Sequence, residues 1–371
     1  MRYFDHNAGT PLHPEVVDFL AHAYRLEPVG NPSSVHAPGR AARARLDDAR
    51  ERVGKVLGRP AREVTFTSSG SEACAMAVLG LGVRGTLVTS AIEHPAVLLA
   101  AERRGRSVVQ LRPAGNGRVP EGGFEQALAE PGVTLCALQA ANNETGVLQP
   151  VAEVAALARK RDLPTFVDAV QAPGRVPPML DAESAAYSAH KFGGPAGVGM
   201  LVVWRGLDFH PLIPGHQEGG RRGGTPSVVL CEAAALALEL AERERPRTGT
   251  RVEHLRDRLE SAILTSIPRA RVNGYGAPRL ANTSNIQFPG TDGEALLIAL
   301  DLEGFSVSLG AACASGTMRP SPVLLAMGLS ADEARSSLRI SLGSATTEAD
   351  VDGLVDALVR LARSAATTNR G

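Results

Sequence analysis

Lysine is scarce in this chain of 371 residues. Only Lys55, Lys160 and Lys191 are lysines among its 39 basic residues, so arginine carries almost every positive charge. An arginine stays protonated in proteins, whereas a desolvated lysine amine can lose its proton and attack a carbonyl group. Lys55 and Lys160 lie in polar helical patterns and are interpreted as surface charges. Lys191 follows an apolar run and precedes a glycine-rich turn, so it is either a snorkelling lysine at a strand end or a reactive amine.

Other features are missing as well. The formal net charge is zero and no long run of like charge occurs, which argues against a nucleic-acid-binding surface. No apolar run reaches membrane-spanning length, and residues 1–7 contain no signal-peptide core, so we expect a cytoplasmic protein without membrane contact. The four cysteines show neither a CxxC motif nor the Cys/His spacing of a metal site, so neither a disulfide framework nor a metal is expected.

The first two-thirds of the chain alternates short β-branched runs with amphipathic stretches. This pattern predicts an α/β protein with βα units around a mostly parallel sheet. Seven strands are expected at residues 63–67, 86–89, 107–111, 134–138, 165–168, 185–188 and 199–203, with a further strand at 283–288. Helices are expected at residues 39–57, 72–79, 96–103, 151–161, 228–245, 252–267, 293–302 and 348–365.

The polar stretch 243–249 predicts an interruption between two helices. We therefore place a domain boundary near residue 250, with a larger domain at 13–250 and a smaller one at 251–371. Residues 1–12 are expected to pack on the smaller domain.

Informative polar residues fall at the carboxyl ends of predicted strands, where ligands of open parallel sheets bind. One strand runs through Ser69, Gly70 and Ser71 into a helix, whose free amides attract an anion. Another strand ends in Asp168. Alone, the first segment is an ordinary capped turn and Asp168 is a helix cap. Together with Lys191 they indicate pyridoxal phosphate, which needs an amine to form the imine, a carboxylate for the pyridine nitrogen and a helix terminus for the phosphate.

Further candidates have two interpretations each. His94 at a strand-to-helix junction could stack on a flat ring and move protons, or cap the helix. Asn143 could bind a ring hydroxyl, or form a turn. Arg339, inside an apolar strand-like run, could meet an anion such as a carboxylate or form a structural ion pair.

The four thiols differ in their surroundings. Cys313 is embedded in Gly, Ala and Ser, which predicts an accessible, reactive thiol on a mobile segment. Cys74, Cys136 and Cys231 lie in apolar patterns and are interpreted as inert core residues.

Taken together, these segments closely resemble the cysteine desulfurases, which are pyridoxal phosphate enzymes of the class V aminotransferase group. The likeness runs from residues 3–8 to residues 336–343, and residues 30–36 and 217–225 are similar to two further family signatures. The resemblance implies the type I fold, with a seven-stranded large domain and a smaller α+β C-terminal domain.

The resemblance also implies roles for individual residues. Lys191 would carry the cofactor as a Schiff base, Asp168 would pair with the pyridinium nitrogen, and His94 would stack on the ring. The ring hydroxyl region would be contacted by Asn143 and Gln171. The phosphate would be bound by Gly70, Ser71, Ser188 and His190, with Thr225 reaching across from the partner subunit of a homodimer.

At the substrate side, Arg339 matches the arginine that binds the substrate carboxylate, Asn31 lies near it, and Cys313 matches the persulfide-forming cysteine. The implied reaction converts L-cysteine to L-alanine. The stretch after Cys313 is similar to the long-loop branch, which passes sulfur to acceptor proteins for iron–sulfur cluster assembly or tRNA thiolation.

Three departures from the family pattern stand out. Ser69-Gly70-Ser71 replaces the commoner Gly-Ala-Thr, Ala189 stands where Gly is usual, and Gly219 stands where Arg is frequent. Alternatives remain open: a selenocysteine lyase or an aminotransferase on the same fold, or a cofactor-free sulfur carrier or assembly platform.

Overall fold

The larger sheet is mostly parallel. The computed structural model describes residues 2–25, 30–82, 84–103, 105–178, 182–310 and 319–368, and within them the seven strands follow the order β2-β8-β7-β6-β5-β3-β4. These strands are β2 (Val64–Thr67), β3 (Thr86–Ser90), β4 (Val108–Leu111), β5 (Val133–Gln139), β6 (Thr165–Asp168), β7 (Ser184–Ser188) and β8 (Gly199–Val203). Strand β8 is antiparallel to both β2 and β7, and the other neighbours are parallel. The predicted mostly parallel seven-stranded sheet is confirmed.

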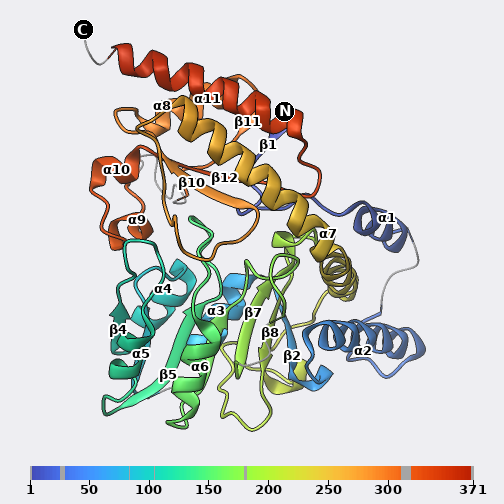
Figure 1. Cartoon of the computed structure of the whole chain (residues 1–371). Coiled ribbons are helices and arrows are strands. Elements are labelled where there is room, and N and C mark those ends of the chain that lie inside the picture. Colours follow the sequence, from blue (N-terminus) through green and yellow to red (C-terminus); the bar gives the residue numbers. More distant parts are fainter. Residues whose placement is uncertain are drawn as a thin grey trace.

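Helices cover both faces of this sheet (Figure 1). They are α1 (Pro14–Ala23), α2 (Ala37–Leu57), α3 (Gly70–Gly80), α4 (Pro95–Arg103), α5 (Glu121–Ala127) and α6 (Val151–Arg159), with short 3-10 turns η1 (Ala61–Glu63), η2 (Ala189–Lys191) and η3 (Glu218–Gly220). Successive residues of a strand point to opposite faces. In β5, Leu135 and Ala137 pack in one core with α3 and α4, whereas Cys136 and Leu138 pack in another with α2 and α6. Because both faces are buried here, β5 and β8 carry apolar residues at successive positions rather than alternating with polar ones.

A second group of elements has its own hydrophobic core. Strand β10 (Thr283–Gln287) lies between β9 (Arg271–Val272) and β12 (Ser337–Ser341), antiparallel to both, and β1 (Arg2–Tyr3) pairs in parallel with β11 (Phe305–Ser306). The helices of this group are α8 (Gly293–Leu302) and α11 (Glu348–Thr368), whereas the short helices α9 (Pro322–Ala326) and α10 (Ala331–Arg335) bury Leu324 and Ala334 in a core of the larger sheet. Apolar residues of α8, α11, β10 and β12 share the core with Phe4.

The interruption predicted at residues 243–249 is wrong. Helix α7 (Val228–Ser266) runs through this stretch for 39 residues and contains Pro246. A proline inside a helix removes one backbone donor and usually kinks or breaks the helix. Here Leu238 packs in a core of the larger sheet and Leu255 packs in the core of the second part, so tertiary contacts hold both halves of the helix. Figure 1 shows α7 passing from one part of the molecule to the other.

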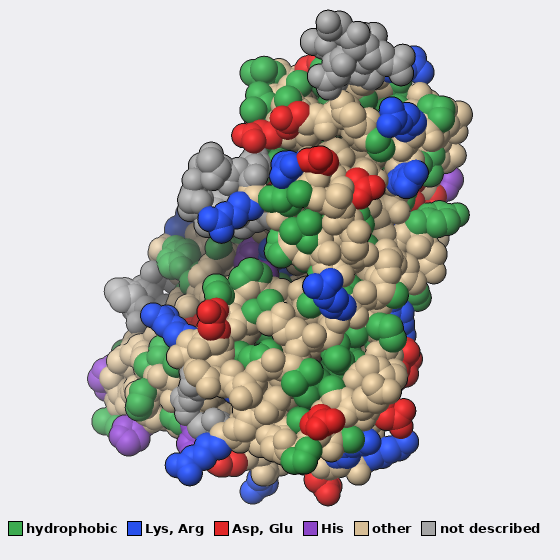
Figure 2. Space-filling model, turned by 90° about the vertical axis from the view of Figure 1, so that its left-hand side faces the viewer, with side chains coloured by type: hydrophobic (Ala, Val, Ile, Leu, Met, Phe, Trp, Pro, Cys, Tyr) green, Lys and Arg blue, Asp and Glu red, His purple; other side chains and the backbone are tan. Residues whose placement is uncertain are grey.

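The surface carries both signs of charge. On the face seen in Figure 2, basic and acidic side chains are interspersed over the whole height of the molecule. In the described part of the chain, no helix has both the length and the apolar character needed to cross a membrane.

Candidate active site

A cavity of about 350 Å³ opens at the carboxyl ends of the central parallel strands. Gln139, Asp168 and Ser188 end strands β5, β6 and β7, and all three line the cavity. Of the site residues expected from the sequence, the cavity brings together Gly70, Ser71, His94, Asn143, Asp168, Gln171, Ser188, His190, Lys191 and Arg339. Residues as far apart in the sequence as Gly70 and Arg339 therefore line one cavity at the strand ends.

Lys191 is the last residue of η2, directly after β7. Its Nζ atom donates to the carbonyl oxygens of Asn7 at 2.7 Å and Ala8 at 2.8 Å. Burial, followed by the positive charges of Arg175 and Arg339, lowers the pKa of Lys191 to about 8. About a tenth of the amine is therefore neutral, and hence nucleophilic, at pH 7, far more than for an unperturbed lysine.

Asp168 lies under the cavity and is 8% exposed. One of its carboxylate oxygens accepts a hydrogen bond of 3.0 Å from the backbone N–H of Val170. Burial raises the pKa of Asp168, and the imidazole of His94 opposes this shift. A buried carboxylate of this kind is stabilised by a cationic partner.

His94 precedes α4, and its Nδ1 atom accepts a hydrogen bond of 3.1 Å from the N–H of Ala96. Its ring lines the cavity while remaining accessible. Desolvation lowers the pKa of His94, which favours the neutral ring. His94 therefore caps the helix, as one of the two interpretations expected, and it also presents its ring to the cavity, while stacking on a flat ring stays a prediction.

The amino end of α3 forms one wall of the cavity. The N–H of Gly70 donates to Ser188 Oγ at 3.3 Å, and this hydroxyl lies 2.9 Å from His190 Nδ1. A Cβ atom on residue 70 would lie 2.8 Å from the Cβ of Ser188, so the close approach of helix and strand requires glycine. First-turn amides, with the hydroxyl groups of Ser71 and Ser188, make a site suited to a phosphate group.

Arg339 reaches the cavity from β12 and is 3% exposed. Its Nη2 atom lies 2.7 Å from Asp5 Oδ1, and Nη1 donates to the carbonyl oxygen of Asn143 at 3.2 Å. Its Nε atom is buried without a hydrogen-bond partner among the described residues. Arg339 thus forms a structural ion pair and also retains a free donor beside the cavity.

Gln171 belongs to the wall shared with the amino-terminal segment. Its Nε2 atom donates to the carbonyl oxygen of Asn7 at 3.0 Å, and its Oε1 atom accepts from Arg175. Asn7, Ala8 and Arg175 received no role from the sequence. Asn7 and Ala8 act through their backbone carbonyl groups, which the sequence cannot reveal because every residue has one. Residues 3–8 did, however, belong to the segments that carry the resemblance.

Two expected site residues are not in this cavity, and a third falls outside the described part of the chain. Thr225 lines a separate cavity of about 200 Å³ with Phe66 and Arg222, and its expected role lies across a dimer. Asn31 is exposed in the turn before α2, where its Oδ1 atom accepts from Ser33 N at 2.9 Å. Cys313 lies outside the described residues.

The other three cysteines, Cys74, Cys136 and Cys231, are buried. Burial raises the pKa of each of these thiols. A thiol without thiolate character is a poor nucleophile, so their predicted burial and low reactivity agree with the structure.

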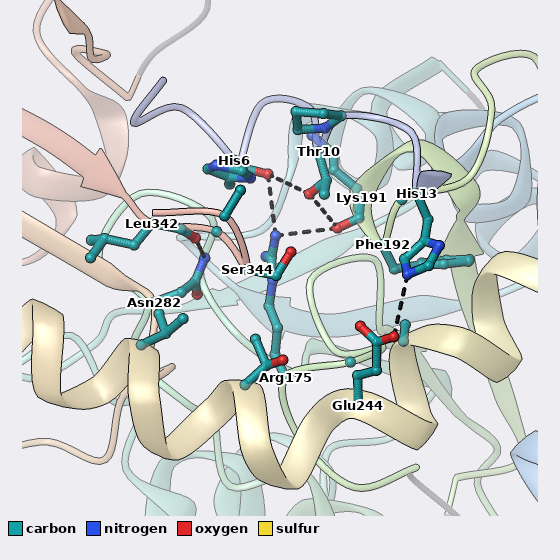
Figure 3. Close-up of a pocket in the computed structure, with 18 of the residues that line it drawn as sticks. His6, Thr10, His13, Arg175, Lys191, Phe192, Glu244, Asn282, Leu342 and Ser344 are labelled. Carbon is teal, nitrogen blue, oxygen red and sulfur yellow. Dashed lines mark hydrogen bonds and ion pairs between the residues drawn. The ribbon is translucent and has the colours of Figure 1, made fainter. Parts of the chain in front are cut away.

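A second cavity, of about 310 Å³, lies on the other side of Lys191. Figure 3 shows its wall, where His6, Thr10, Lys191 and Arg175 are joined by hydrogen bonds. Glu244 of α7 lines the same cavity and lies 3.3 Å from His13.

Comparison with known proteins agrees with this geometry. The family description "Aminotransferase class-V" matches residues 2–354. The chain is 39% identical to an IscS-like cysteine desulfurase of Mycobacterium tuberculosis, over 100% of this chain and 99% of the relative. It is 36% identical to the cysteine desulfurase IscS of Dictyoglomus turgidum, over 97% of this chain and 94% of that relative. Among solved structures, a NifS-like protein from Rickettsia africae superimposes with a TM-score of 0.89 at 32% identity, covering 97% of this chain and 99% of that one.

The chain therefore belongs to the class-V aminotransferase family and, within it, to the cysteine desulfurases. Members of this family generally depend on pyridoxal phosphate. The type I fold expected from the resemblance is confirmed.

Proposed function

We propose that the cavity at the carboxyl end of the larger sheet binds pyridoxal phosphate and converts L-cysteine to L-alanine, with transfer of the sulfur atom. One observation carries the proposal. The amine of Lys191, the buried carboxylate of Asp168 and the amino end of α3 converge on a single cavity. Membership of the cysteine desulfurases supports the choice of substrate.

The residues present fit the cofactor. The first-turn amides of α3, with Ser71, Ser188 and His190, would hold its phosphate. Asp168 would stabilise a protonated pyridine nitrogen, which supplies the cationic partner that its buried carboxylate needs. The cavity volume is within the range of small-molecule sites.

The ring itself would be held by three other side chains. His94 would stack on its face, while Asn143 and Gln171 would contact the region of its hydroxyl group. Lys191 would attach the cofactor covalently through its amine. When bound, the cofactor withdraws electrons from the Cα atom of an amino acid.

The remaining steps belong to side chains of this chain. The free amine of Lys191 would remove the Cα proton of the substrate, a task that suits a base of pKa about 8. Arg339 binds the substrate carboxylate with its planar guanidinium. The expected role of Asn31 beside it stays a prediction, because Asn31 lies outside this cavity. His94 moves protons between the ring and the substrate thiol.

Sulfur transfer is assigned to Cys313. Its thiolate attacks the sulfur atom of the substrate, so that a sulfur–sulfur bond forms and the carbon–sulfur bond breaks. The electron pair of the broken bond returns to the carbon skeleton, which takes up a proton and leaves as alanine. The persulfide on Cys313 then passes its outer sulfur to an acceptor protein.

The proposal extends to the assembly. The working form would be a cytoplasmic homodimer in which Thr225 of each chain completes the phosphate site of the other. The sulfur acceptor would be an iron–sulfur scaffold or a tRNA-thiolation protein. Each chain would consist of a large domain (13–250) and a small domain (251–371), with residues 1–12 packed on the small one.

The test is turnover of L-cysteine by the purified protein in the presence of a reductant, with alanine and sulfide quantified. We expect equal amounts of the two products. Cys313→Ala should retain the bound cofactor yet lose alanine formation, whereas the buried-thiol control Cys231→Ala should retain both. Normal turnover by Cys313→Ala would reject the assigned role.

Two further substrates separate the alternatives. Preferred turnover of selenocysteine would identify a selenocysteine lyase, and amino transfer from an amino acid to a 2-oxo acid would identify an aminotransferase. A protein that stays colourless with pyridoxal phosphate and is unchanged by borohydride would be a cofactor-free carrier.

A further inference from the structure

Arg175 separates the two cavities that meet at Lys191. Its guanidinium lines the second cavity, and its Nη2 atom donates to the carbonyl oxygens of His6 at 3.2 Å and Lys191 at 3.3 Å. Its Nη1 atom donates to Gln171 Oε1, on the side of the first cavity. The three acceptors belong to three segments of the chain, so one planar side chain connects all of them.

Thr10 completes this arrangement. Its hydroxyl oxygen lies 2.9 Å from the carbonyl oxygen of Lys191 and 3.2 Å from that of His6, the same two atoms that Arg175 contacts. Figure 3 shows the resulting ring of four residues. The backbone of Lys191 is therefore held from both sides, and its position depends on the guanidinium.

Among the described residues, no carboxylate neutralises the charge of Arg175. Its three hydrogen-bond acceptors are uncharged oxygen atoms, and no acidic side chain in this part of the chain forms an ion pair with it. The amine of Lys191 also donates only to uncharged carbonyl groups. A fixed positive charge behind an amine disfavours the protonated form of that amine.

Other groups also face this amine. The charged and titratable side chains around Lys191 are Arg175, Arg339, Asp5, Asp168, His94 and His190. The two acids favour the ammonium form, whereas the two arginines oppose it. Arg339 is itself paired with Asp5 at 2.7 Å, which leaves Arg175 as the cation without an acidic partner.

We propose that Arg175 is a positioning residue for Lys191: its guanidinium fixes the backbone of Lys191 and the side chain of Gln171, and its charge disfavours the protonated form of the Lys191 amine. The direction of the pKa of Lys191, lowered to about 8 by burial and then by Arg175, agrees with this role. This role of Arg175 rests on the proposed function in one respect only, namely that the aldehyde attacked by Lys191 is pyridoxal phosphate.

The amine can be titrated without any cofactor. The full chain is freed of bound aldehyde with hydroxylamine, labelled with acetic anhydride over a range of pH, and analysed by peptide mass spectrometry. Lys55 and Lys160 are exposed and are the only other lysines, so they serve as internal references. In Arg175→Gln we expect the midpoint of Lys191 labelling to rise by about one pH unit. The charge-matched control is Arg43→Gln, on the exposed surface of α2, where Arg43 pairs with Asp47.

Arg175→Lys separates charge from geometry. A lysine keeps the charge but contacts a single acceptor instead of three. We expect Lys191 to be labelled with the same midpoint as in wild type, because the charge is retained. Attachment of pyridoxal phosphate to Lys191 should be at least about three-fold weaker, because Gln171 is released. If Arg175→Gln does not fold, this variant still decides: a raised midpoint or wild-type attachment overturns the proposal.

Two results distinguish this role from a purely structural one. An unchanged midpoint in a folded Arg175→Gln, or equal rises in the Gln and Lys variants, overturns the proposal. If wild type fails to attach pyridoxal phosphate while the midpoint still shifts, the proposed function fails and the role of Arg175 stands.

Discussion

The Nζ atom of Lys191 lies 2.7 Å from the carbonyl oxygen of Asn7, a residue 184 positions earlier in the chain. A carbonyl group accepts a hydrogen bond from the ammonium and from the neutral amine alike, whereas a carboxylate would favour the ammonium strongly. The amino-terminal segment thus holds the amine in place and stabilises its protonated form less than a carboxylate would. This relationship makes the reactivity of Lys191 sensitive to pH in the physiological range.

The first prediction concerns that pH dependence. Because the pKa of Lys191 is lowered to about 8, the neutral fraction of the amine should rise about tenfold per pH unit below pH 8 and level off above it. Attachment of pyridoxal phosphate to Lys191 in the cofactor-free protein should follow this curve. Stopped-flow absorbance from pH 6 to pH 10 measures it, and a rate that still rises tenfold between pH 9 and pH 10 would contradict the expectation.

A second prediction separates stability from activity at Asp168. Asp168→Asn keeps the oxygen that accepts from Val170 N–H and removes a buried charge whose pKa is raised by burial. Without cofactor, the variant should be at least as stable as wild type at pH 8. Its cysteine turnover should fall by at least about 100-fold, because a neutral amide cannot keep the pyridine nitrogen protonated. Urea unfolding and alanine release check the two halves independently.

Glu93 gives a third prediction, on stability against pH. It is 5% exposed, its Oε1 atom accepts from Ser90 Oγ and Gln139 N, and burial raises its pKa to about 8. An acid whose pKa is higher in the folded state stabilises the fold fully below its ordinary value of 4.5. That stabilisation is lost as the pH rises toward 8, by about 1.4 kcal/mol per pH unit at the steepest.

The isosteric variant Glu93→Gln cannot lose this proton. Its free energy of unfolding relative to wild type should therefore increase between pH 5 and pH 8 and stay constant above that. Parallel stability curves for the two proteins, measured by urea unfolding without cofactor, would show that Glu93 is not protonated in the fold.

Arg339 and Asp5 provide a fourth prediction. Arg339→Gln removes the cation that would bind the substrate carboxylate, so kcat/KM for L-cysteine should fall by about 10- to 100-fold. Asp5→Asn removes the competing carboxylate, which now lies 2.7 Å from the guanidinium, and should lower KM several-fold. A rise of KM in Asp5→Asn would show that the ion pair instead orients Arg339 for the substrate.

The sequence predicts the larger sheet well because its strands are short apolar runs bounded by polar and glycine-rich turns. Strand β6 covers residues 165–168 and strand β8 covers residues 199–203, both with the expected bounds. Helix α7 was harder to predict, because the polar stretch around Pro246 resembles a loop until the cores on either side are known.

For the site, strand ends are visible in the sequence, and Lys191, Asp168 and Gly70 could be placed from them. Contacts that depend on backbone carbonyls could not, since Asn7 meets Lys191 through an atom that every residue has. Arg175 was missed for a related reason: one arginine among many gains its importance only from the three acceptors around it.

The amino-terminal segment also constrains the order in which the protein can mature during translation. The N–H of Ser341 donates to the carbonyl oxygen of Phe4, and the N–H of Asn7 donates to Ser341 Oγ across 334 positions. Residues 4–7 leave the ribosome long before Ser341 is made, so they must wait for it before they settle. Until then the amine of Lys191 lacks the carbonyl groups of Asn7 and Ala8 as acceptors. A nascent chain could therefore form the larger sheet before its active site is complete.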